Sequence, residues 1–281
     1  MWKKTKIIGL IGLLLVILMP GLSTKALSQL EPYGVYEDWK NPEISADRWR
    51  TGRNDDSLEV TREIHGNRLE MKYRVIGSST SNTGALSAQN RLFTKNPSAI
   101  TQIETDFKVI SLFTGRCQAN LNSTRVRPAA IDLNKFNDGT TTGGTDMTGD
   151  HFVRVLVNRE ADSSNPEDVL TASAFLFRCL DPVCGNASSK VFILDMGKVS
   201  VGDKFTLRII WDNLKNRFIV GLNDDDFILS YDPNLNKGTA KSPFATIRMT
   251  MVAGNCTAEP IETEATTEVR EVRTNRSAVI P

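Results

Sequence analysis

The sequence has few histidines and few aromatic residues. Its 281 residues include only two histidines, and aromatic residues make up 7% of the chain. So few imidazoles leave little material for a nucleophilic triad or a histidine-based zinc site. Neither histidine lies in a Gly-x-Ser-x-Gly setting. We expect His65 to lie in a solvated turn. We expect His151 to open a strand from a loop rather than to form a metal or acid–base site with Asp146 and Asp150.

Beyond its beginning, the chain lacks an apolar run long enough to cross a bilayer. Lys3, Lys4 and Lys6 precede the apolar run Ile7 to Met19, and Ala26-Leu27-Ser28 supplies small residues after it. This order is typical of a signal peptide cleaved before Gln29. The apolar run is shorter than the roughly 20 residues of a spanning helix, and an uncleaved N-terminal anchor is the alternative. We therefore predict a signal peptide at 1–28, one domain at 29–276, a tail at 277–281, and a secreted or periplasmic location.

An excess of charge of either sign is also absent. The signal carries four of the 34 Lys and Arg and none of the 33 Asp and Glu, so the mature formal charge is 30 − 33 = −3. Such a balance gives no reason to expect a nucleic acid or an anionic membrane as partner.

Cysteines are few, and all four lie in the exported part. An even number in an oxidising compartment favours two disulfides, for which three connectivities exist. The short Cys179-Leu-Asp-Pro-Val-Cys184 segment favours a turn, so we pair its ends, which leaves Cys117 with Cys256. A zinc site is the alternative, but the spacings match no usual ligand pattern.

Helical periodicity is missing, and the apolar residues alternate instead. Leu69, Met71, Tyr73 and Val75 share one face of a predicted strand. Phe205 to Asp212 and Phe218 to Leu222 form the clearest hairpin, and Phe227 to Ser230 follows. Glu259 to Arg276 suits a final strand better than a disordered tail. Further strands are expected at Ala85 to Thr94, Thr101 to Leu112, Val126 to Phe136, Phe152 to Asn158, Leu170 to Arg178, Lys190 to Leu194 and Phe244 to Ala253. The pattern predicts an all-β sandwich or barrel.

Several segments resemble bacterial concanavalin A-like lectin/glucanase domains. The segments are Tyr36-Glu37-Asp38-Trp39, Asp47-Arg48-Trp49-Arg50, Gly66 to Met71, Val201 to Asp212 and Glu264 to Arg273. The resemblance spans most of residues 34 to 275 and implies a jelly roll of two antiparallel sheets, one bent to leave a concave face. Related domains bind carbohydrate with this face or with the loops at its rim, whereas others serve as spacers or adhesion modules, so the fold alone does not decide function.

The catalytic pattern of glucanases with this fold, Glu-x-Asp-x-x-Glu on one strand, is incomplete here. Glu104-Thr105-Asp106 matches its first half, but Val109 stands where the third carboxylate belongs. Glycoside hydrolysis needs two carboxylates in complementary roles, so we expect Glu104 and Asp106 to be the solvated side of a half-buried strand. We predict no cofactor. Calcium is the one ion considered, with Asp224 to Asp226 and Asp146 to Asp150 as sources of oxygen ligands.

Strand alternation offers one candidate set for binding a saccharide. Adjacent residues of a strand point to opposite faces, so the residues next to Val153, Val155, Val157, Ile131 and Leu133 face outward if these five face the core. In the segment Leu170 to Arg178 we place Phe175 and Phe177 in the core, which turns Arg178 outward. The candidate ligand-binding residues are Asp132, Asn134, Phe152, Arg154, Asn158 and Arg178. An ordinary solvated sheet face is the alternative.

Three functions remain open on the sequence. A non-catalytic module that binds carbohydrate or another envelope polymer is favoured. The alternatives are a glycan-cleaving enzyme whose carboxylates come from different strands, and a structural or adhesive surface protein.

Overall fold

The computed structural model describes residues 30–54, 57–141 and 143–280. The chain divides into two units, Met1–Leu30 and Glu31–Pro281, and the description below concerns the second. The expected signal peptide and its cleavage point lie outside the described residues. No helix among the described residues is long and apolar enough to cross a membrane.

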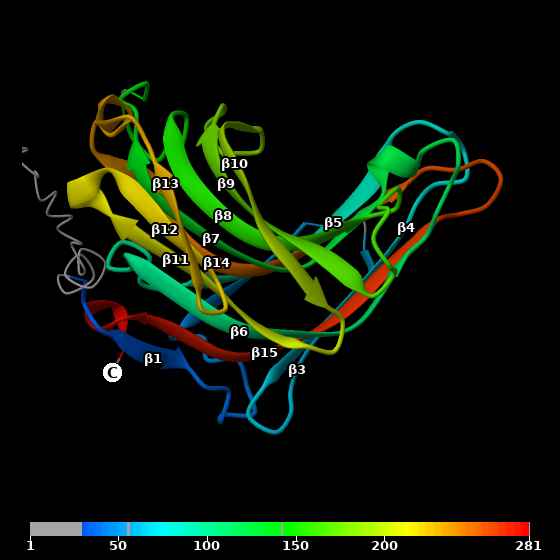
Figure 1. Cartoon of the computed structure of the whole chain (residues 1–281), viewed down its shortest axis with the longest axis horizontal. Coiled ribbons are helices and arrows are strands. Elements are labelled where there is room, and N and C mark those ends of the chain that lie inside the picture. The colour runs from blue at the N-terminus through cyan, green and yellow to red at the C-terminus, as the bar shows by residue number, and fades with distance from the viewer. Residues whose placement is uncertain (1–29, 55–56, 142, 281) are drawn as a thin grey trace, which may run out of the picture. The chain divides into compact units, whose positions relative to one another are not determined.

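Two antiparallel sheets make up the second unit (Figure 1). In the eight-stranded sheet the order is β13-β12-β11-β6-β15-β4-β3, and β1 pairs with β15. Its strands are β1 (Tyr33–Glu37), β3 (Ser57–Ile64), β4 (Leu69–Ile76), β6 (Gln102–Thr114), β11 (Lys204–Asp212), β12 (Arg217–Leu222), β13 (Asp225–Ser230) and β15 (Glu262–Asn275).

The seven-stranded sheet has the order β10-β9-β8-β7-β14-β5-β2. Its strands are β2 (Trp49–Asn54), β5 (Ala85–Thr94), β7 (Arg125–Asn137), β8 (Asp150–Glu160), β9 (Val169–Cys179), β10 (Ala187–Ser200) and β14 (Thr239–Gly254). Figure 1 shows β8 and β9 curving along their length. The two sheets form the jelly-roll sandwich that the resemblance implies, and the only helical elements among the described residues are three-residue 3₁₀ turns.

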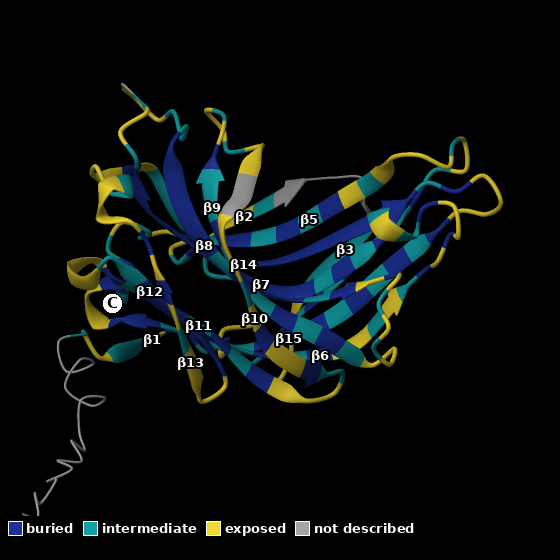
Figure 2. Cartoon of the chain, turned by 45° about the horizontal axis from the view of Figure 1, so that its top comes forward, coloured by how far each residue is buried: buried dark blue, intermediate teal, exposed yellow. Residues whose placement is uncertain are grey.

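Alternating side chains fill the space between the sheets. Leu69, Met71, Tyr73 and Val75 of β4 are buried, and Figure 2 shows buried and less buried residues alternating along the strands. Each Å² of apolar surface removed from water stabilises the fold by about 25 cal/mol. Burial of the side chains on both inner faces is therefore the main stabilising contribution. A one-residue slip would turn these side chains to solvent, so the apolar pattern specifies the register.

Aromatic residues that carry the resemblance belong to this core. Tyr36 meets Trp49 edge to face at 5.2 Å between ring centroids, and Trp39 stacks on Trp49 at 5.7 Å. The Glu37 carboxylate accepts hydrogen bonds from the Trp39 amide and from Nε1 of Trp49, both at 3.2 Å. These residues therefore fix the entry of the chain into the sandwich.

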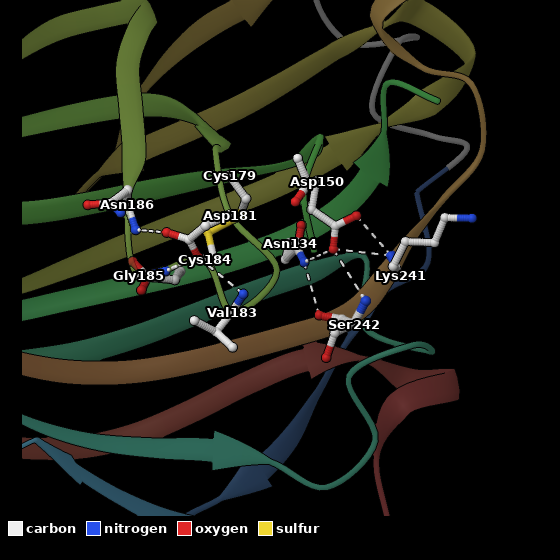
Figure 3. The surroundings of a disulfide bond; sticks show 12 residues. Asn134, Asp150, Cys179, Asp181, Val183, Cys184, Gly185, Asn186, Lys241 and Ser242 are labelled. Carbon is white, nitrogen blue, oxygen red and sulfur yellow. Dashed lines mark hydrogen bonds between the residues drawn. A yellow bond between two sulfur atoms is a disulfide. The ribbon is translucent and has the colours of Figure 1, made fainter. Parts of the chain in front are cut away.

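Both predicted disulfides are present. Cys117 pairs with Cys256, and Cys179 pairs with Cys184. Figure 3 shows the second bond beside Asp181, whose carboxylate accepts hydrogen bonds from the backbone amides of Val183, Gly185 and Asn186. That carboxylate and the disulfide together hold the loop that leads from β9 to β10.

Candidate functional site

The outer face of the seven-stranded sheet gathers the candidate residues. Strand register aligns Arg50, Phe93, Thr246, Asp132, Arg154 and Phe175 in one row across β2, β5, β14, β7, β8 and β9. The adjacent row contains Gly52, Arg91, Arg248, Ala130, Leu156 and Ser173. Residues paired in antiparallel strands share a face, so side chains from distant parts of the chain meet here.

Asp132 is the acidic centre of this face. Its carboxylate accepts hydrogen bonds from Nε and Nη2 of Arg154, at 2.6 and 3.1 Å, and from Nη1 of Arg248 at 3.1 Å. Asp132 is only 2% exposed. Burial alone would raise the pKa of its carboxyl, but Arg154 and Arg248 outweigh burial and hold that pKa below its ordinary value. The carboxylate therefore stays ionised at neutral pH.

The predicted outward orientation of Asp132, Asn134, Phe152, Arg154 and Asn158 agrees with the register, since Ile131, Leu133, Val153, Val155 and Val157 are in the core. Phe152 is only 4% exposed. Its ring stacks on Phe177 with centroids 5.0 Å apart, and the guanidinium of Arg154 lies over both rings. Phe152 thus supports Arg154 instead of presenting a free ring.

Asn134 and Asn158 lie at opposite ends of the outer face. Asn134 is buried, and its Nδ2 donates to Asp150 and to the Ser242 carbonyl, both at 3.0 Å (Figure 3). The amide of Asn158 donates to Glu160 at 3.3 Å. Asn134 therefore links β7 to β8 and β14, whereas Asn158 lies on the open part of the face.

The predicted position of Arg178 is wrong, because Phe175 and Phe177 face outward. They pair with Arg154 and Phe152, while Leu170, Ala172, Ala174 and Leu176 occupy the core positions of β9. Arg178 therefore lies on the other face of β9. Its Nε donates to Asp138 at 2.6 Å and its Nη2 to Thr140 at 2.9 Å, so it does not join the candidate set.

The two histidines have different environments. His65 is exposed in the turn between β3 and β4, as predicted, with Nε2 2.9 Å from Glu63. His151 is the second residue of β8, is 1% exposed and stacks on Phe136 at 4.9 Å. Burial lowers its pKa despite Asp138 at 3.4 Å. His151 is thus a core residue rather than part of a loop.

The expectation that Glu104 and Asp106 are solvated is wrong for Glu104. It lies on the eight-stranded sheet, is 6% exposed, and pairs with Arg208 at 3.0 Å and with Arg273. Asp106 pairs with Arg273 at 2.7 Å. Neighbouring strands supply arginines opposite these carboxylates, which is why the carboxylates form an ion-pair network rather than a hydrated surface.

The candidate calcium loops have other interactions. Asp226 pairs with Arg208 at 2.5 Å, and Asp146 accepts a hydrogen bond from the Thr148 amide at 2.8 Å. No group of three or more His, Cys, Asp or Glu side chains among the described residues is arranged to hold a metal ion. Calcium binding stays a prediction.

A depression of about 530 Å³ opens on the outer face over β7, β8 and β9. Its lining residues are Arg127, Leu156, Asn158, Glu160, Asp162, Ser163, Ser164, Thr171, Ser173 and Phe175. Arg127 and Phe175 were missed in the sequence analysis. Phe175 was missed because large aromatic side chains were assigned to the core, and Arg127 because no local motif marks it.

Two arginines add positive charge to this face, whereas Glu160 and Asp162 of the depression add negative charge. Burial, with repulsion from Arg125 and Arg154, lowers the pKa of Arg127 to about 10. The pKa of Arg248 is lowered to about 9, again by burial first and then by Arg154. Both groups remain protonated at neutral pH, so the face presents positive charge.

Comparisons with known proteins concern the fold. Neither a protein-family model nor a curated protein sequence matches the chain. A laminarinase from Flavobacterium sp. UMI-01 is 11% identical, with a TM-score of 0.43, over 88% of this chain and 100% of its own. Alginate lyase A1-II′, of polysaccharide lyase family 7, is 13% identical, with a TM-score of 0.41; the match covers 76% of this chain and 83% of the lyase. The lectin UEA-II, complexed with galactose, is 8% identical, with a TM-score of 0.36; the match covers 86% of this chain and 99% of the lectin. All three have concanavalin A-like jelly-roll folds.

Proposed function

We propose that this chain is a non-catalytic carbohydrate-binding module of the secretory route, and that its ligand lies on the outer face of the seven-stranded sheet. The depression beside Phe175 carries the proposal. Its half-buried ring lines the depression together with Thr171 and Ser173 of the same strand and Asn158 of the next. Hydroxyl, amide and aromatic groups around one hollow suit the hydroxyls and C–H faces of a sugar.

The state of Asp132 supports binding without catalysis. A general acid must hold a proton at the working pH, and a nucleophile needs a free oxygen. Asp132 has a lowered pKa, and its two oxygens accept from Arg154 and Arg248. Its carboxylate therefore positions the two arginines.

Location outside the cytoplasm is part of the proposal. Two disulfides are typical of proteins that fold in an oxidising compartment. Such a location would give the module access to envelope or extracellular polysaccharides.

Affinity electrophoresis in polysaccharide gels and a glycan array test the binding site. Phe175→Ala should weaken saccharide binding about five- to tenfold, as expected for loss of an aromatic contact. Phe113→Ala is the matched control, because Phe113 is 57% exposed on the eight-stranded sheet, and it should leave binding unchanged. If no saccharide is retained, or both variants bind equally, the proposed site is wrong.

A glycan-cleaving activity is the second candidate, because Glu160 and Asp162 both line the depression. Two carboxylates beside a sugar are the minimum for acid–nucleophile chemistry. This candidate predicts that new reducing ends or unsaturated products form from a bound polysaccharide and that Glu160→Gln abolishes their formation. Binding without product formation would exclude it.

A further inference from the structure

Arginine is concentrated on the outer face of the seven-stranded sheet. On the strands β2, β5, β14, β7 and β8, the described side chains of this face include six arginines and three carboxylates, so their formal charge is 6 − 3 = +3. The carboxylates are Asp132, Asp150 and Glu160. The arginines are Arg50, Arg91, Arg125, Arg127, Arg154 and Arg248. The whole sequence has a formal net charge of only +1, so the positive charge of this face is a local feature.

Three of these arginines have donors without a partner. Nε of Arg91, of Arg125 and of Arg127 is buried with no hydrogen-bond acceptor among the described residues. No described carboxylate forms an ion pair with any of the three, whereas Arg154 and Arg248 both pair with Asp132. A buried donor without an acceptor costs free energy, and a bound anion would supply the missing acceptor.

Mutual repulsion adds to this cost. Burial is the main cause that lowers the pKa of Arg91; the nearby Arg154 and Arg50 lower it further, and together these effects outweigh the opposite effect of Asp132. The pKa of Arg127 is likewise lowered by burial first and then by Arg125 and Arg154. Each guanidinium therefore raises the free energy of its charged neighbours. An anion between them would relieve both desolvation and repulsion.

Guanidinium groups also cover most of the aromatic rings on this face. Arg154 lies over Phe152 and Phe177, at 5.4 and 5.0 Å from the ring centroids. Arg50 and Arg91 lie 4.7 and 5.4 Å from the centroid of Phe93. A sugar chain crossing the sheet would therefore meet planar donors that match carboxylate and sulfate oxygens.

We propose that the ligand is an anionic polysaccharide, carboxylated or sulfated, whose acid groups contact Arg91 and Arg127. The inference rests on the proposed carbohydrate-binding function and adds the chemical class of the sugar. Arg127 lines the depression beside Phe175, and Arg91 pairs in register with Arg248 near the centre of the sheet. Sugars bound at these two positions would lie across several strands rather than at one point.

Isothermal titration with two matched pairs of glycans tests this inference. The first pair is a polyuronate and its carboxyl-reduced neutral form, and the second is a sulfated glycan and its desulfated form. We expect binding of at least one charged form, at least tenfold weaker binding of its neutral counterpart, and loss of affinity as salt increases. The pair that binds identifies which acid group is recognised.

Variants locate the acid-binding positions. Arg91→Gln and Arg127→Gln should each weaken binding of the charged glycan about tenfold or more. Arg68→Gln is the matched control, because Arg68 lies next to β4 on the eight-stranded sheet and pairs with Glu268. It should leave the affinity unchanged. Thermal unfolding and near-ultraviolet circular dichroism confirm that each variant is folded.

The outcomes separate the two proposals. Equal binding of charged and neutral forms would overturn the anionic ligand while leaving carbohydrate binding intact. Binding of neither form of either pair would refute both. Equal binding of a polyuronate and of poly-glutamate would show recognition of charge without a sugar and would also overturn the inference. Unchanged affinity in folded Arg91→Gln and Arg127→Gln would remove these residues from the site.

Discussion

Asp132→Asn removes a negative charge that two guanidinium groups share and leaves the shape of the side chain nearly unchanged. In the wild-type protein, Arg154 makes two hydrogen bonds to this carboxylate and Arg248 makes one. Removing one partner of a buried ion pair costs about 3–5 kcal/mol. Arg154 is partly exposed and can reach solvent, so we expect a loss near the lower limit, about 3 kcal/mol.

Urea unfolding measures this loss. With an m value of about 3 kcal/mol per M, a destabilisation of about 3 kcal/mol lowers the urea midpoint by about 1 M. Asp38→Asn is the control, because Asp38 pairs with Lys40 at the surface and such pairs contribute about 1 kcal/mol or less. If the two variants unfold at similar urea concentrations, Asp132 is not the electrostatic centre of the outer face.

The same variant predicts a pH dependence. The pKa of Asp132 is lower in the folded protein than its ordinary value, so the unfolded chain binds the proton more readily in acid. The stabilisation is therefore fully present above about pH 4 and is lost as pH falls through the folded-state pKa. The difference in unfolding free energy between wild type and Asp132→Asn should be constant from about pH 5 to 7 and shrink in stronger acid. A constant difference down to pH 2 would contradict this reasoning.

Three further predictions concern the framework. Phe136→Ala should destabilise the domain by about 3–5 kcal/mol in urea unfolding, because its buried ring contacts His151, Phe218 and Tyr231; a loss below about 1 kcal/mol would contradict this packing. The pKa of His151 is lowered, so the wild type should lose stability as pH falls through about 6.5, and His151→Phe should flatten that slope in thermal scans; equal slopes would refute it. The Cys117–Cys256 bond spans 139 residues and Cys179–Cys184 spans 5, so replacing each pair by alanine should cost about 5 and about 2 kcal/mol in urea unfolding; the reverse order would contradict the loop-entropy argument.

Much of the sandwich is predictable because its strands have a simple period. Ala85 to Thr94 was predicted residue for residue as β5, and the last strand was also predicted. The strand β3, at Ser57–Ile64, was missed. Arg62 interrupts its apolar alternation. The side chain reaches Asn90 of the opposite sheet, with Nε 2.6 Å from Oδ1, and such an inward polar pair has no signal in one sequence.

The candidate site was less predictable, because it depends on which strands are neighbours. Arg91, Arg127 and Arg248 lie far apart in the chain and become adjacent through the order β5-β14-β7. The formal net charge of +1 for the whole sequence gives no indication of this cluster. The face of β9 was inverted because rings were expected inside, whereas Phe175 and Phe177 extend an outer row that includes Phe152.

Arginine-directed chemical labelling with mass spectrometry tests most directly whether this face binds the ligand. The folded protein is treated with phenylglyoxal in the presence and absence of a saturating anionic oligosaccharide, and labelling is compared at each arginine. The proposed site predicts protection of Arg91 and Arg127, with Arg68 and Arg74 on the eight-stranded sheet labelled as before. Protection of Arg68 and Arg74, with Arg91 and Arg127 unaffected, would place the ligand on the opposite sheet and contradict the proposed site.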